Sequence, residues 1–125
     1  MRRHRADYFL YLMKLEAYDM NRWNIPDSLE IELLERDTNC VYCRKTFDPL
    51  SSKTRATWEH IVNDLLIITR ENIARCCASC NSSKGQKPLS SWLASVYCKT
   101  NGVTKDRVAE VVRRHLPESE KHGPG

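Results

Sequence analysis

The segment CASCNSSKG, residues 77–85, governs the architecture, because it opens with a Cys-x-x-Cys pair and runs into a helix-ending glycine. A second pair, within CVYC, supplies Cys40 and Cys43. Two such pairs can offer four thiolates to a tetrahedral zinc ion, with Zn–S bonds of about 2.3 Å. We therefore expect a structural Zn²⁺ site made by Cys40, Cys43, Cys77 and Cys80, with disulfides as the alternative.

The size and composition of the chain point to one soluble domain. Its 125 residues carry a formal net charge of +4 and include six cysteines. No apolar run approaches the roughly 20 residues of a membrane span, and the basic start of the chain lacks a signal-peptide cleavage site. Paired cysteines without a secretory signal favour metal binding in a reducing compartment. We expect a cytoplasmic protein with no membrane association, whose single domain covers residues 1–117 and whose residues 118–125 are disordered.

The excess positive charge is confined to the cysteine-bounded segment. Residues 40–90 hold eight Lys/Arg and four Asp/Glu, which accounts for the whole net charge of +4. Such a segment is where a polyanion would dock, although a solvated face is the simpler alternative. Cys76 and Cys98 fall outside the two pairs and are expected to behave as small core hydrophobes.

Hydrophobic spacing and turn residues predict the remaining elements. The spacing favours a broad apolar helix at residues 6–20, and Asp27 with Glu30 resembles a capping box for a second helix that ends near residues 37–39. Strands are expected at residues 55–62 and 73–76, and a turn that includes Asp64 lies between them. Helices are predicted over residues 78–85, 89–97 and 104–116.

The spacing between the cysteine pairs is wider than a simple zinc module needs. Such modules have about 15–20 residues between their pairs, whereas 33 residues separate Cys43 from Cys77 here. The insert contains the dipeptide Glu59-His60, and the second pair leads directly into Asn81. Zinc binding would therefore bring these polar side chains close together.

The ordered set of motifs resembles the HNH endonucleases, the ββα-metal class of nucleases. The resemblance covers residues 40–85 and rests on four motifs: Cys40-x-x-Cys43, Glu59-His60-Ile61, Asn72-Ile73 and Cys77-x-x-Cys80-Asn81-x-x-Lys84-Gly85. It implies an α+β fold with a ββα-metal core at residues 40–87, stapled by the four-cysteine zinc site. Helical flanks at residues 6–38 and 88–117 are inferred from their spacing alone.

The resemblance also implies a role for each matching residue. His60 would be the general base that deprotonates the attacking water, while Glu59 and Asn81 would hold a catalytic Mg²⁺ or Mn²⁺ ion. Asn72 would brace the loop that orients His60. The simpler alternatives are a structural histidine, a solvated carboxylate at Glu59 and a helix cap at Asn81. Many HNH members have Asp where this chain has Glu59.

The resemblance implies DNA as the partner and phosphodiester hydrolysis to 5′-phosphate and 3′-hydroxyl ends as the reaction. The basic residues expected to contact nucleic acid are Lys53, Arg55, Lys84 and Lys87, although Lys84 could be an ordinary surface lysine. An RNA-cleaving toxin-type nuclease and a catalytically silent zinc-binding nucleic-acid module are the alternatives.

Two structural expectations follow from these assignments. Neighbouring strand residues point to opposite faces, so Glu59 and His60 can serve one site only if the strand bends or bulges near residues 59–62. The apolar helix at residues 6–20 needs cover on more than one face, which makes it the candidate interface of a homodimer.

Overall fold

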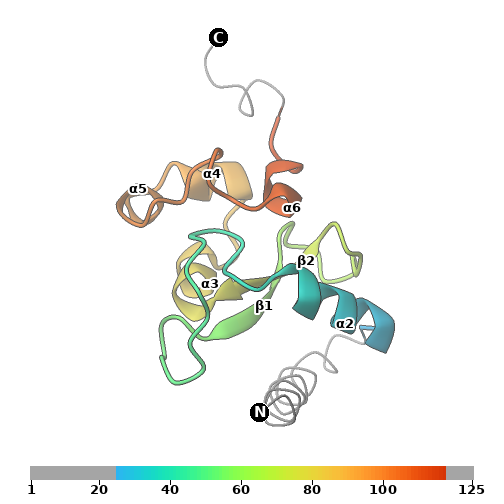
Figure 1. Cartoon of the computed structure of the whole chain (residues 1–125). Helices are drawn as coiled ribbons and strands as arrows, with labels where there is room; N and C mark the ends of the chain where they lie inside the picture. The colour runs from blue at the N-terminus through green and yellow to red at the C-terminus, as the bar shows by residue number, and fades with distance from the viewer. Residues whose placement is uncertain (1–24, 118–125) are drawn as a thin grey trace.

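The computed structural model describes residues 25–117, and an antiparallel hairpin of two strands lies at its centre (Figure 1). Strand β1 (Ala56–His60) pairs with β2 (Ile73–Cys77) in a register that runs from Ala56 opposite Cys77 to His60 opposite Ile73. With helices around this sheet, the chain is a small mixed α/β protein. Both predicted strands are confirmed, with shorter bounds for the first. The register is regular through Glu59 and His60, so no bulge interrupts the strand, but the chain bends directly after His60, at residues 61–63, where a bend or bulge was expected.

Helix α3 (Ala78–Lys84) follows β2 without a loop, as predicted. The Cys77 side chain caps its first turn by accepting a hydrogen bond from the Cys80 backbone N–H. Gly85 ends the helix with φ +51°, a conformation that a residue with a Cβ atom rarely adopts. The Asn81 side chain of α3 donates to Thr57 Oγ1 of β1, which fixes the helix against one face of the hairpin.

Helix α2 (Asp27–Arg36) packs against β2 and builds a small core of its own. Its apolar side chains join those of the hairpin in a buried cluster of Ile25, Leu33, Leu34, Trp58 and Ile73. The expected capping box is wrong, because Pro26 is the N-cap and no side chain caps the helix. Asp27 is instead the first helical residue, where its negative charge favours the helix N-terminus.

The predicted helix at residues 89–97 is two short helices, α4 (Leu89–Leu93) and α5 (Val96–Thr100). Ser95 interrupts the run with an extended backbone, and its side chain accepts a hydrogen bond from the Cys98 backbone N–H. A serine that can cap a helix therefore starts a new one here. The break leaves Val96 largely exposed, although the apolar spacing had placed it in the core.

The predicted helix at residues 104–116 is also shorter, with only α6 (Glu110–Arg113) helical. Thr104 accepts a hydrogen bond from the Arg107 backbone N–H, so it caps a single turn and does not start a long helix. Ala109 is extended, and its N–H donates to the carbonyl of Val41 in the first cysteine pair. This long-range bond replaces a helical one and explains the break.

The main core connects the cysteine pairs with the C-terminal helices. It gathers the four paired cysteines and Cys76, Cys98, Val41, Tyr42, Ile61, Ala74, Trp92, Val103, Val108 and Val112. In Figure 1 α4, α5 and α6 lie together at one end of the hairpin, away from α2. Cys76 and Cys98 are both buried, as expected of small hydrophobic side chains.

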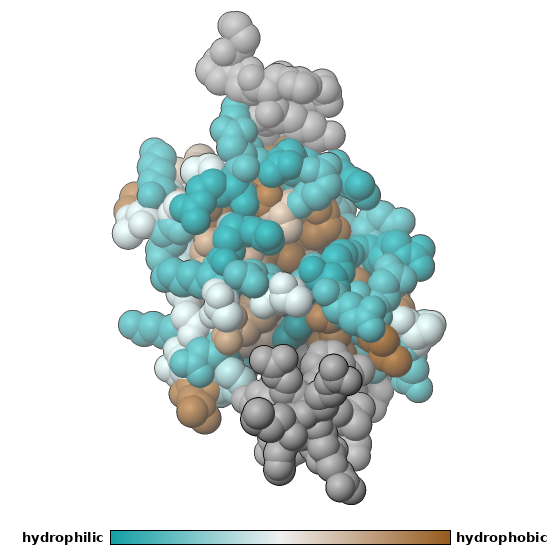
Figure 2. Space-filling view, in the orientation of Figure 1, coloured by the Kyte–Doolittle hydropathy of each residue, from teal (hydrophilic) through white to brown (hydrophobic). Residues whose placement is uncertain are grey.

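Hydrophilic residues cover most of the face drawn in Figure 2, with hydrophobic ones showing between them. The large apolar side chains left most exposed are Leu50, Leu66, Val96 and Leu65. Over residues 25–117, no helix combines the length and the apolar character that crossing a membrane requires. The helix expected at residues 6–20, the dimer interface assigned to it and the tail at residues 118–125 fall outside the described residues.

Candidate metal centre and adjoining pocket

The four paired cysteines converge on one buried point. The Sγ atoms of Cys40, Cys43, Cys77 and Cys80 all lie within 4.8 Å of one another, and Cys43 Sγ is 3.8 Å from Cys77 Sγ. A tetrahedral zinc ion with Zn–S bonds of about 2.3 Å separates its sulfur ligands by about 3.8 Å. All six cysteines are free, so the disulfide alternative is not realised. This cluster could hold a zinc ion.

Backbone amides around the cluster point at its sulfur atoms, as expected of zinc knuckles. The N–H groups of Tyr42 and Cys43 donate to Cys40 Sγ at 3.4 and 3.5 Å. Arg44, with φ +69°, completes the turn of the first pair. The Tyr97 hydroxyl donates to Cys80 Sγ at 3.2 Å, and such donors stabilise thiolates that bind a metal.

A pocket of about 540 Å³ contains three of the four predicted catalytic side chains, Glu59, His60 and Asn81, whereas Asn72 does not line it. We call it the hairpin pocket, and it is lined by Trp58, Glu59, His60, Asn63, Leu65, Asn81 and Gln86. Glu59 and His60 belong to opposite faces of β1. The sheet of the described residues has two strands, so the outer edge of β1 is open and side chains from both faces can line one pocket.

Glu59 is buried and held by two partners. Its Oε2 atom accepts a hydrogen bond from the Tyr42 hydroxyl at 2.7 Å and lies 3.1 Å from Lys84 Nζ. Burial raises the pKa of Glu59, while Lys84 and the Tyr42 hydrogen bond act in the opposite direction. Both of these side-chain contacts use Oε2. Glu59 is thus not the solvated carboxylate of the simpler alternative.

Lys84 has no exposed surface, with 0% of its side chain accessible. Its ammonium group pairs with Glu59 and also donates to Asn63 Oδ1 at 3.5 Å. This placement corrects the expectation that Lys84 contacts phosphate, since a fully buried ammonium group offers nothing to a docked polyanion. Its role here is to neutralise the buried carboxylate.

Asn81 reaches the pocket from the fourth position after the end of β2, within α3. Its Nδ2 atom donates to Thr57 Oγ1 at 2.9 Å and to the Trp58 carbonyl at 3.1 Å. These two bonds fix the orientation of the amide and leave Oδ1 as its remaining acceptor. Asn81 does not cap α3, because Cys77 fills that role.

His60 ends β1 and is 95% buried, with 5% of its surface accessible. Burial lowers the pKa of His60; the Asp64 carboxylate opposes this, and the Lys84 ammonium adds to it. The net effect is a lowered pKa, which keeps the imidazole neutral near pH 7. A neutral imidazole is the form that accepts a proton.

The Asn72 side chain braces the loop that follows His60. Its Oδ1 atom accepts a hydrogen bond from the Val62 N–H at 2.7 Å, and its Nδ2 atom donates to the carbonyls of Val62 and Ile67. Asp64 stabilises the same loop by accepting from the Leu66 N–H, in line with the expected turn role.

The remaining predicted basic residues are all exposed, but they lie at different distances from the pocket. The carbonyl of Lys87 accepts a hydrogen bond from Asn63 of the pocket, so Lys87 is nearby. Lys53 and Arg55 precede β1, and five residues of strand separate Arg55 from His60 by about 16 Å. No contact brings these two side chains to the pocket.

Five contributors to the site carry no signal that we used in the sequence. Tyr42 holds Glu59, while Trp58, Asn63, Leu65 and Gln86 line the hairpin pocket. The position of Tyr42 between Cys40 and Cys43 is the one feature of the sequence that places it near the site. The others meet only through tertiary contacts.

No family model, curated protein or solved structure matches the chain.

Proposed function

We propose that this protein is a metal-dependent endonuclease of the HNH type that hydrolyses DNA phosphodiester bonds. The observation that supports the proposal best is the composition of the hairpin pocket. A carboxylate, a neutral imidazole and an oriented amide line one space of about 540 Å³, beside a buried four-cysteine cluster. This is the set of groups that phosphodiester hydrolysis by the HNH mechanism requires.

His60 acts as the general base in this proposal. A ring nitrogen takes the proton of a water molecule as the water oxygen forms a bond to phosphorus. The bond from phosphorus to the 3′ oxygen then breaks, and solvent water supplies the proton that the 3′ oxygen needs. The lowered pKa of His60 suits the first step, because the imidazole enters it unprotonated.

Glu59 and Asn81 offer the oxygen atoms that a hard divalent cation prefers. Glu59 and Asn81 would hold a Mg²⁺ or Mn²⁺ ion, which would polarise the scissile phosphate and stabilise the departing oxygen. The Lys84 ammonium group beside Glu59 weakens the attraction of the Glu59 carboxylate for a metal cation. We therefore expect weak binding in which water and phosphate complete the coordination.

The proposed Zn²⁺ ion has a structural role, with all four positions filled by cysteine. It ties the loop that carries Tyr42 to the start of α3, and so connects the partner of Glu59 to the helix that carries Asn81 and Lys84.

Cleavage of supercoiled plasmid tests the proposal. The zinc-loaded protein is incubated with Mg²⁺ or Mn²⁺, and with a structured RNA in parallel. We expect nicked plasmid whose ends can be resealed by DNA ligase, which needs a 5′-phosphate and a 3′-hydroxyl. His60→Ala should lower the rate by about 10²-fold or more, in the range of a lost general base.

His122→Ala is the matched control, because His122 carries none of the motifs. It should cleave as the unmodified protein does. Binding of DNA without cleavage under any divalent ion would replace the proposal with a nucleic-acid-binding module. Cleavage confined to RNA would replace DNA as the substrate.

A further inference from the structure

Three hollows lie next to one another along the surface, and the hairpin pocket is the first of them. A middle hollow of about 510 Å³ shares Asn63 and Gln86 with the hairpin pocket. It shares His115 with a third hollow of about 380 Å³. The shared residues make the three hollows neighbours in one continuous series.

The middle hollow has mainly apolar walls. Ile61 and Leu89 line it together with Leu116. Such walls suit the sugar and base portions of a nucleotide, which have apolar surfaces. They offer no strong partner for a phosphate group.

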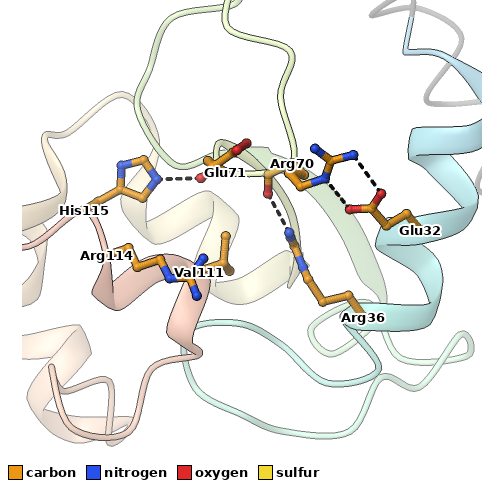
Figure 3. Close-up of a pocket in the computed structure, with 7 residues that line it drawn as sticks. All are labelled: Glu32, Arg36, Arg70, Glu71, Val111, Arg114 and His115. Atoms are coloured by element: carbon orange, nitrogen blue, oxygen red, sulfur yellow. Dashed lines mark hydrogen bonds and ion pairs between the residues drawn. The ribbon is translucent and has the colours of Figure 1, made fainter.

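The third hollow is lined by three arginines from three segments, and we call it the arginine hollow (Figure 3). Arg36 belongs to α2, Arg70 to the loop before β2, and Arg114 follows α6. Glu32 and Glu71 also line it. Glu71 turns its carbonyl oxygen toward the His115 ring, at 2.6 Å.

Arg36 and Arg70 are already committed to partners within the protein. Arg36 donates to Asp37 and to the carbonyls of Arg70 and Ile73. Arg70 makes two hydrogen bonds to Glu32, at 2.7 and 3.1 Å. These bonds hold the two guanidinium groups in place at the surface of the arginine hollow.

Of the three arginines in the arginine hollow, Arg114 is the one with the longest ion pair. Its nearest carboxylate is Glu110, with 3.5 Å between Nε and Oε1, and the other Glu110 oxygen pairs with Arg113 at 2.7 Å. Within residues 25–117, neither terminal nitrogen of Arg114 has a hydrogen-bond partner. Its side chain is 70% exposed, so this fork of donors is accessible to a phosphate.

We propose that the three hollows form the path of one DNA strand, with a phosphate of that strand bound by Arg114 in the arginine hollow. The strand would run from the scissile phosphate at His60 past the apolar middle hollow to this second contact. The inference rests on the proposed function and adds to it a substrate-gripping site outside residues 40–85. Arg114 is a binding residue in it, with no part in the chemistry.

Binding to duplex DNA by the full-length His60→Ala protein tests this path without interference from cleavage. Fluorescence anisotropy is measured on a series of duplexes in which each is longer than the one before by one helical turn, about 10 base pairs. Each duplex is measured at several salt concentrations. Adding Arg114→Gln should weaken binding of the long duplexes severalfold. It should also lower the slope of log K against log salt by about 1, as for one lost phosphate contact.

Two further variants sharpen the test. Arg107→Gln makes the same charge change at an exposed arginine that lines none of the three hollows, and it should leave affinity unchanged. Glu71→Gln removes a negative charge from the arginine hollow and should strengthen binding. Thermal melting of each variant checks that the fold is kept.

Equal behaviour of Arg114→Gln and Arg107→Gln would overturn the strand path. If the protein with His60 intact still nicks plasmid, the proposed function survives that result. Absence of both nicking and DNA binding would overturn the proposed function and the strand path together.

Discussion

Lys84 and Glu59 form a buried ion pair, in which the Lys84 side chain has no accessible surface and the Glu59 side chain has 6%. The ion pair is 3.1 Å long and is completed by the Tyr42 hydroxyl on the same carboxylate oxygen. A buried ion pair adds little net stability relative to apolar residues, but loss of one partner leaves an uncompensated charge. The pair therefore makes Glu59 dependent on Lys84.

Lys84→Met should lower the free energy of unfolding by about 3–5 kcal/mol near pH 7. Without Lys84 the pKa of Glu59 in the folded protein rises further above its value in the unfolded chain, which is about 4.5. Folding then favours the protonated carboxyl, so the free energy of unfolding falls as pH rises above about 4.5. The deficit should shrink at acidic pH, where Glu59 is protonated and needs no cation. Urea denaturation at several pH values measures it. Lys87→Met at an exposed lysine is the control, and an equal loss there would contradict the explanation.

The pH dependence of cleavage should report the protonation of His60. The base is active when neutral, so the rate falls as pH drops through its pKa. Because burial lowers that pKa, the acid limb should lie below the ordinary value of about 6.5. A bound divalent cation would act in the same direction.

Asp64→Asn extends this prediction. The Asp64 carboxylate raises the pKa of His60, so its removal should move the acid limb to still lower pH. Rate profiles between pH 4.5 and 8, in steps of about half a unit, would show the shift. An acid limb above the ordinary histidine range would argue against His60 as the base.

At the scale of elements, short helices replace the long ones that the apolar spacing predicted. The break between α4 and α5 coincides with Ser95, which accepts from the Cys98 N–H at 3.2 Å. The break before α6 coincides with the bond from the Ala109 N–H to the Val41 carbonyl at 2.9 Å. In both places a specific hydrogen bond outweighs the preference of the chain for continuous helix.

Ser95→Ala should therefore destabilise the protein by about 1 kcal/mol, the usual cost of losing an N-cap. The measurement is the change in urea midpoint at constant slope. Ser91→Ala is the control, because Ser91 is exposed within α4 and caps nothing. A larger effect at Ser91 than at Ser95 would rule out the capping explanation.

At the scale of the whole molecule, the four-cysteine cluster joins segments that lie far apart in the sequence. It connects the loop before β1 with the end of β2 and the start of α3, and the C-terminal segment adds to it through Tyr97 and Ala109. The main core surrounds this cluster. A metal ion bound by these cysteines would thus lie at the centre of the fold.

Zinc removal should unfold most of the protein, because structural zinc sites contribute on the order of 10 kcal/mol. Elemental analysis should find one zinc per chain, and a strong chelator should abolish the cooperative thermal transition. Cys43→Ser should lose the zinc, whereas Cys98→Ser, at a buried cysteine outside the cluster, should keep it. A chelated protein that still melts cooperatively at the same temperature would contradict this role.

Local patterns were sufficient to predict the hairpin, α3 and the cysteine cluster. The two Cys-x-x-Cys turns and the helix end at Gly85, which has positive φ, are local structures set by short-range sterics, and the paired cysteines indicated that the two distant turns would meet. The buried state of Lys84, the two helix breaks and the row of hollows depended on tertiary packing. The burial of Lys84, the break before α6 and the row of hollows depend on partners more than ten residues apart in the sequence. The break between α4 and α5 depends on a serine cap that competes with helix continuation. The periodicity of the apolar residues does not encode which of these contacts is the more stable.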